Sequence, residues 1–92
     1  MTLEVLTPDQ LIYKGEATSV LFPGIDGQFG VLSHHTALIS ALKQGTIVVK
    51  KGKGGEIEGS LKKEVADQTE FNIDVNGGTV EVNNNKILVL AE

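Results

Sequence analysis

Apolar and polar residues alternate along most of this chain, and glycine, proline or asparagine interrupts the alternation every eight to twelve residues. Residues 3–5 begin the pattern, and residues 71–75 repeat it with three apolar residues separated by Asn72 and Asp74. Because successive side chains of a β-strand point to opposite faces, a period of two predicts strands with one buried face. Short strands at this spacing indicate an all-β sandwich or barrel.

The individual strands can be placed by the same alternation. Residues 34–43 contain apolar residues at both helical and strand spacing, and their shortness favours strand and turn. Residues 87–90 are apolar at every position, which is typical of a strand in the interior of a sheet. Further strands are expected at residues 3–5, 11–14, 17–22, 29–32, 46–50, 71–75 and 80–82.

The connections between these strands are rich in glycine. Residues 23–27 are expected to form a loop, and Asn76-Gly77-Gly78 a hairpin turn that requires positive φ. Residues 51–55 have the composition of a flexible hairpin tip. Residues 56–70 are open to two interpretations: one helical turn supported by Leu61 and Val65, or a mobile loop.

Composition excludes several classes of function. The chain has 92 residues, enough for one domain with its own core, and it has no cysteine for a disulfide, a thiolate zinc site or a cysteine nucleophile. Eight lysines, no arginine and a net charge of −4 argue against nucleic acid as a partner. The longest apolar run, Ile87–Ala91, is far shorter than the ~20 residues that span a bilayer, so no direct membrane insertion is expected.

No motif indicates catalysis. His34 and His35 with Asp26 could form a metal site or supply a general base, but adjacent residues of a strand point to opposite faces. A structural or interface role for the two histidines is therefore favoured. Gly24-x-x-Gly27-x-x-Gly30 lacks the Gly-Lys-Ser/Thr and the following helix of a phosphate loop. The residues therefore indicate a non-catalytic β module, and no catalytic residue, metal or cofactor is expected.

Several blocks resemble one family in order and spacing. They are Leu3–Pro8, Gly15–Ala17, Pro23-Gly24-x-x-Gly27-Gln28-Phe29-Gly30-Val31-Leu32-x-x-His35-x-x-Leu38, Gly77-Gly78-x-Val80-Glu81-Val82 and Asn85–Glu92. Together they are similar to the N-terminal domain of the epsilon subunits of F-type ATP synthases, over about residues 2–50 and 71–92.

The resemblance implies a flattened β-sandwich of about ten mostly antiparallel strands, with residues 1–92 as one domain. It implies a rotor subunit without catalytic or nucleotide-binding residues, which links the gamma subunit to the c ring of a bacterial proton-translocating enzyme. That subunit would lie peripherally on the cytoplasmic side of the inner membrane. Coupling of ion transport to ATP synthesis would be its function.

Two sets of contact residues follow from the resemblance. Gln28 stands where many relatives have glutamate, so an ionic contact there becomes a neutral hydrogen bond. Ser33-His34-His35-Thr36-Ala37 replaces the common Pro-Gly-His-Ala-Pro. The c-ring contact is expected at Gly24, Asp26, Gly27, Gln28, Phe29 and Gly30, and the gamma contact at His35, Thr36, Ala37 and Leu38.

Relatives commonly continue into a C-terminal pair of helices, and a chain that stops at Glu92 would lack that helical domain. Residues 51–70 are longer than is typical, and no functional residue is assigned there. Two other functions stay open from the sequence. One is a free-standing sandwich that binds carbohydrate or peptide, and the other is a metallohydrolase built on His34, His35 and Asp26.

Overall fold

The computed structural model describes residues 1–52 and 55–92 of the chain. It contains seven strands and one single-turn helix, which confirms the all-β class. The elements are β1 (Thr2–Leu6), β2 (Leu11–Glu16), β3 (Ser19–Gly24), β4 (Gly27–Leu32), β5 (Leu38–Lys50), α1 (Lys62–Val65), β6 (Glu70–Asn83) and β7 (Lys86–Ala91).

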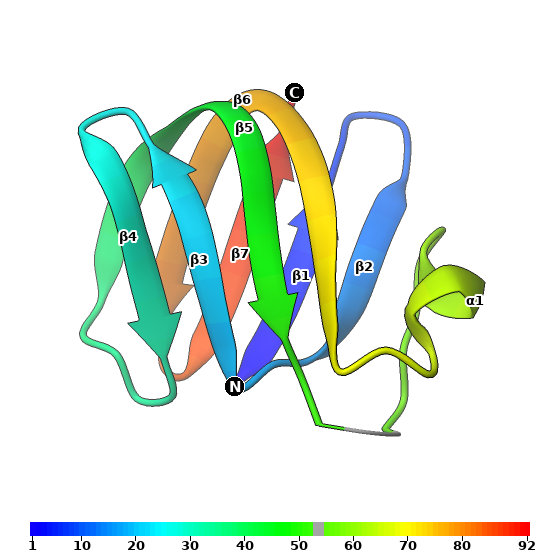
Figure 1. Cartoon of the computed structure of the whole chain (residues 1–92). Coiled ribbons are helices and arrows are strands. Elements are labelled where there is room, and N and C mark those ends of the chain that lie inside the picture. The colour runs from blue at the N-terminus through cyan, green and yellow to red at the C-terminus, as the bar shows by residue number, and fades with distance from the viewer. Residues whose placement is uncertain (53–54) are drawn as a thin grey trace.

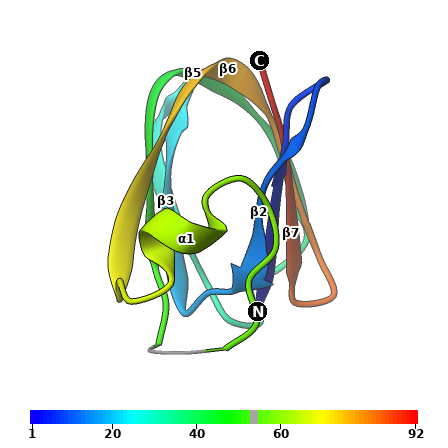
Figure 2. The same ribbon diagram turned by 90° about the vertical axis from the view of Figure 1, so that its right-hand side faces the viewer.

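All seven strands belong to one sheet with the order β2-β1-β7-β6-β5-β3-β4. Neighbouring strands are antiparallel except β1 and β7, which are parallel. β5 and β6 are long, and both bend over one end of the molecule, so that the sheet folds into two layers (Figures 1 and 2). The result is a flattened sandwich with extents of 32 × 28 × 18 Å.

The nine strands expected from the alternation become seven because two pairs of them are continuous, and seven is also fewer than the about ten that the resemblance implied. Residues 38–50 form β5 without a break at Gly45. Residues 70–83 form β6, so the predicted hairpin turn at Gly77-Gly78 is wrong. Gly77 and Gly78 do have the expected positive φ, +125° and +142°, but the chain uses it to bend a strand.

The sandwich is closed by apolar residues on the inward faces of both layers. Tyr13 of β2 meets Phe71 of β6 across the layers, with ring centroids 5.0 Å apart. β7 lies between β1 and β6, as predicted for an apolar strand in the interior of the sheet. The largest fully buried side chains are Tyr13, Phe22, Leu3, Ile47, Ile87, Val5, Val20, Val31, Val49, Val80, Val82 and Val89.

The segment that follows β5 covers the side of the sandwich formed by β2. Lys14 and Glu58 exchange backbone hydrogen bonds of 2.8 and 2.9 Å, and Leu61 donates to the carbonyl of Ile12. One helical turn, α1, then buries Val65 in the core, as the helical interpretation of residues 56–70 predicted. Lys53 and Gly54 of the predicted hairpin tip lie outside the described residues.

Candidate functional site

The predicted loop from Gly24 to Gly30 is a tight β-hairpin. Gly24 of β3 pairs with Gly27 of β4, and only Ile25 and Asp26 remain between them. A side chain at Gly24 would meet the Phe29 ring at 2.9 Å, and Gly27 has a φ of +125°. The two glycines therefore allow the chain to reverse within two residues. The expectation of a longer loop was wrong at this point.

The hairpin presents a small mixed surface at its tip. Ile25, Asp26 and Gln28 are exposed, while Phe29 is half-buried against Phe22 with ring centroids 5.4 Å apart. The amide of Ile25 donates to the carbonyl of Ala41, which holds the tip against β5. Of the predicted c-ring contacts, Asp26 and Gln28 point polar groups outward, and Phe29 anchors the hairpin.

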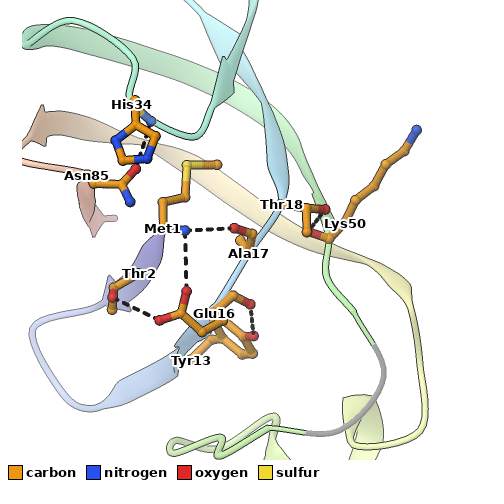
Figure 3. A network of polar contacts seen from close by, with 9 residues as sticks. All are labelled: Met1, Thr2, Tyr13, Glu16, Ala17, Thr18, His34, Lys50 and Asn85. Carbon is orange, nitrogen blue, oxygen red and sulfur yellow. Dashed lines mark hydrogen bonds and ion pairs between the residues drawn. The ribbon is translucent and has the colours of Figure 1, made fainter.

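The predicted gamma contact lies at the other end of β4. His34 has a φ of +64°, and its amide donates to Oδ1 of Asn85 over 2.8 Å (Figure 3). This position corresponds to the glycine of the related Pro-Gly-His-Ala-Pro pattern. The asparagine side chain thus holds a left-handed backbone conformation that glycine adopts without strain.

His35 is fixed by two contacts of its own. Its amide donates to the carbonyl of Leu32 over 3.2 Å, and its Nδ1 lies 2.7 Å from the carbonyl oxygen of Thr36. Since a carbonyl only accepts, Nδ1 carries the proton in this hydrogen bond. Thr36 and Ala37 are exposed beside it, so this turn offers a defined polar surface.

A polar network stiffens the same end of the sandwich (Figure 3). The Glu16 carboxylate accepts a hydrogen bond from the Thr2 hydroxyl and lies 3.3 Å from the Met1 amino group. The hydroxyl of the buried Tyr13 donates to the carbonyl of Glu16 over 3.1 Å. Burial raises the pKa of Tyr13, and the charge of Glu16 raises it further.

The structure also reveals an apolar surface that the sequence interpretation missed. It covers the outward face of β1, β7, β6 and the first half of β5, where Ile39 and Leu90 are 80% and 51% exposed. Ile39 directly follows Leu38, the last predicted gamma contact. We call this surface the outer face; its uncharged members are Leu6, Ile39, Ala41, Thr79, Leu88 and Leu90. The strand register also places Glu81 between Ile39 and Leu88, and Glu4 beside Leu88, so two carboxylates belong to the same rows.

A signal for the outer face was present in residues 87–90. The apolar residues at every position predicted a strand in the interior of the sheet. Ile87 and Val89 are indeed fully buried on the inward side of this strand. On the opposite side, Leu88 is half-buried and Leu90 is exposed. A strand that is apolar on both faces can therefore also indicate a partner on the second face.

The alternative metal site does not form. Asp26 lies at the tip of the β3–β4 hairpin, and His34 and His35 follow the far end of β4, about 17 Å of strand away. Within residues 1–52 and 55–92, no group of three or more metal-ligating side chains comes together. The same ranges contain no helix that is long and apolar enough to cross a membrane.

The comparison with known sequences decides the family. The model of the family described as "ATP synthase, Delta/Epsilon chain, beta-sandwich domain" matches residues 1–60. The chain belongs to this family. The ATP synthase epsilon chain of Sulfurimonas denitrificans is 39% identical over 92 residues, which are 100% of this chain and 60% of that protein. The epsilon chain of Chlorobium limicola is 33% identical over 90 residues, 98% of this chain and 86% of that protein.

Solved structures agree on the fold of this epsilon-type domain. A chain in the Euglena gracilis mitochondrial ATP synthase (OSCP/F1/c-ring) superposes with a TM-score of 0.73 at 21% identity, covering 97% of this chain and 48% of that one. A chain of the Tetrahymena thermophila mitochondrial ATP synthase central stalk and c-ring superposes with a TM-score of 0.66 at 15% identity. The match covers 99% of this chain and 62% of that one.

Proposed function

We propose that this chain is a non-catalytic rotor subunit of a bacterial F-type ATP synthase, which links gamma to the c ring and couples proton transport to ATP synthesis. Family membership and relatives named ATP synthase epsilon chain support the proposal. It places the chain at the inner membrane, peripherally and on the cytoplasmic side. Residues 1–92 would act as one domain, since all seven strands belong to one sheet.

The observation that carries the proposal is the exposed outer face in a member of this family. Ile39 and Leu90 place large apolar side chains in solvent, where hydration of apolar surface is unfavourable. The outer face continues from the turn at residues 35–38 without a break in the chain. A single partner, gamma, would cover His35, Thr36, Ala37 and Leu38 together with this face.

The c ring would contact the opposite end of β4. Asp26 and Gln28 at the hairpin tip can hydrogen-bond to the polar loops of a ring, and Ile25 adds an apolar contact. The exposed Gly27 and Gly30 would let the backbone of the ring approach closely, whereas Gly24 is buried against the Phe29 ring and would act by shaping the hairpin. Because Gln28 is uncharged, Asp26 supplies the only carboxylate between residues 24 and 30.

Binding to purified gamma tests the gamma contact. The double variant Ile39→Lys/Leu90→Lys places two charges on the outer face and should weaken binding at least about 100-fold, because each lysine is desolvated in the complex. Leu21→Lys is the control, since Leu21 is 36% exposed in β3, on the other layer and away from the turn at residues 35–38. Equal binding by the double variant and the control would overturn this proposal.

The carbohydrate-binding alternative is not favoured. Carbohydrate sites use exposed aromatic rings as stacking platforms. In this chain Tyr13, Phe22 and Phe71 are buried, and Phe29 is half-buried against Phe22. Ligand binding on such a platform would require the core to open.

A further inference from the structure

The two edge strands of the sheet, β2 and β4, differ in whether their outer edges form backbone hydrogen bonds. The outer edge of β2 is covered, because Glu58, Ser60 and Leu61 form backbone hydrogen bonds with it. β4, the other edge strand, pairs with β3 on one side. On its other side, no strand among residues 1–52 and 55–92 pairs with it. Figure 1 shows β4 at the margin of the sandwich.

The register identifies the backbone groups on this edge. Gly24 and Gly27 close a hairpin with two residues between them, so they exchange hydrogen bonds, and the bonded pairs then alternate along the ladder. Phe29 and Val31 therefore bond to β3. Gln28, Gly30 and Leu32 direct their amide and carbonyl groups away from β3. Pro23 lies opposite Gln28 in a pair that is not hydrogen-bonded, so its lack of an amide hydrogen removes no bond between β3 and β4.

Nothing in the composition of β4 protects this edge. Natural edge strands commonly carry lysine, proline or a bulge that prevents pairing with another chain. Residues 27–32 contain no charge and no proline, and their pairing with β3 has no irregularity. A Cβ at Gly30 would have the carbonyl of Val20 as its nearest contact at 4.0 Å, so a neighbouring strand can approach this position closely. Leu32 and Leu21, on the solvent side, are 65% and 36% exposed.

We propose that a second copy of this chain pairs with β4 in the antiparallel direction, about a two-fold axis at Gly30. Gln28 of one copy then lies opposite Leu32 of the other, and Gly30 opposite Gly30. Every outward amide in this segment meets an outward carbonyl, and no charge opposes a like charge. The carbonyl of Leu32 already accepts from His35 and has a second lone pair for the new bond.

A second copy fits this edge because residues 27–32 have no charge, so two copies can pair without like charges meeting. The outward residues are spaced symmetrically about Gly30, as an isologous two-fold contact requires. The contact involves one short strand from each copy, so it falls in the class of small, transient interfaces. One consequence rests on the proposed function: the dimer covers Gln28 and Gly30, so pairing and the c-ring contact exclude each other.

Sedimentation equilibrium of the whole chain from about 10 µM to about 1 mM tests the dimer, since this range spans weak dissociation constants. Gly30→Pro removes the outward amide without removing a bond to β3, and should raise the dissociation constant at least about tenfold. Gly30→Ala is the matched control, because it keeps the amide, and it should dimerise like the unchanged chain. A monomer at every concentration, or equal dimerisation of Gly30→Pro and Gly30→Ala, overturns the proposal.

A second variant guards against a fold defect in Gly30→Pro. Gly30→Lys places two lysines together at the two-fold axis, which should weaken the dimer several-fold at low salt and less at high salt. Amide hydrogen exchange gives an independent readout. Gln28, Gly30 and Leu32 should become at least about tenfold better protected as concentration rises, whereas Phe29 and Val31 should not change.

Exchange rates along β4 that do not depend on concentration would overturn the proposal. The dimer experiments contain neither gamma nor c ring. Their failure therefore leaves the proposed rotor function untouched, and a failure of gamma binding leaves the dimer untouched.

Discussion

At the scale of single residues, Tyr13 combines a buried ring with a polar group that must be satisfied. Its hydroxyl donates to the Glu16 carbonyl, and desolvation together with the Glu16 charge raises its pKa above 10.0. The folded state therefore holds the proton more tightly than the unfolded state. The stability that this provides is complete below pH 10.0 and is lost as the pH rises through the folded pKa.

Tyr13→Phe tests this linkage. At neutral pH the variant should be less stable by about 1 kcal/mol, since one buried hydrogen bond is lost. Above about pH 10 the free energy of unfolding should fall less steeply for the variant than for the unchanged chain. Urea unfolding at a series of pH values measures both quantities. Parallel pH profiles for the two proteins would contradict the assigned role of Tyr13.

Asn85 is the second residue whose side chain determines backbone geometry. Asn84 and Asn85 both have positive φ, 52° and 59°, but only Asn85 bonds to the His34 amide. Asn84→Ala and Asn85→Ala should carry similar backbone strain. Asn85→Ala should be further destabilised by about 1 kcal/mol through loss of the hydrogen bond. Denaturant unfolding of both variants measures the difference, and equal stabilities would show that the bond contributes nothing.

At the scale of elements, alternation predicted where strands lie but not which of them are continuous. Glycine with positive φ serves a hairpin turn and a strand bend equally well, so Asn76-Gly77-Gly78 is locally ambiguous. The bend is decided by long-range packing, because β7 lies against Gly78 and Pro23 lies against Gly45. Local residue patterns contain no information on these contacts, which explains why seven strands replace the nine expected from the alternation.

Gly78 is the position at which this bend is most sensitive. A Cβ at Gly78 would collide with the backbone carbonyl of Leu90, and the φ of +142° disfavours any side chain. Gly78→Ala should therefore lower the free energy of unfolding by about 2–4 kcal/mol. Gly30→Ala, in open space on β4, should change it by less than about 1 kcal/mol. Thermal unfolding of the two variants at equal concentration compares them, and similar melting temperatures would contradict the account of the bend.

The candidate site was predictable only in part. The glycine-rich segment and residues 35–38 were singled out by resemblance, and the structure places them at opposite ends of β4. The outer face was missed because alternation assigns buried positions and does not show whether the other side of a strand meets solvent or a partner. Ile39, 80% exposed, came from a segment whose structure was itself ambiguous.

At the scale of the whole molecule, the sandwich separates two proposed contacts. The hairpin tip with Asp26 lies at one end, and the turn with His35 lies at the other, next to the outer face. The molecule is 32 Å in its longest dimension, and the β4 strand alone separates the two positions by about 17 Å. With its two contacts at opposite ends, one sandwich could touch two partners at once, as the proposed coupling role requires.

Site-directed photo-crosslinking in the assembled ATP synthase can locate the two proposed contacts separately. The chain has no cysteine, so Asp26→Cys and His35→Cys each create one labelling site for a benzophenone maleimide. Asp26 is exposed and His35 is half-buried, and neither belongs to the buried core. We expect crosslinks from position 26 to subunit c and from position 35 to gamma. Crosslinks from both positions to the same subunit, or from neither to the rotor, would contradict this expectation.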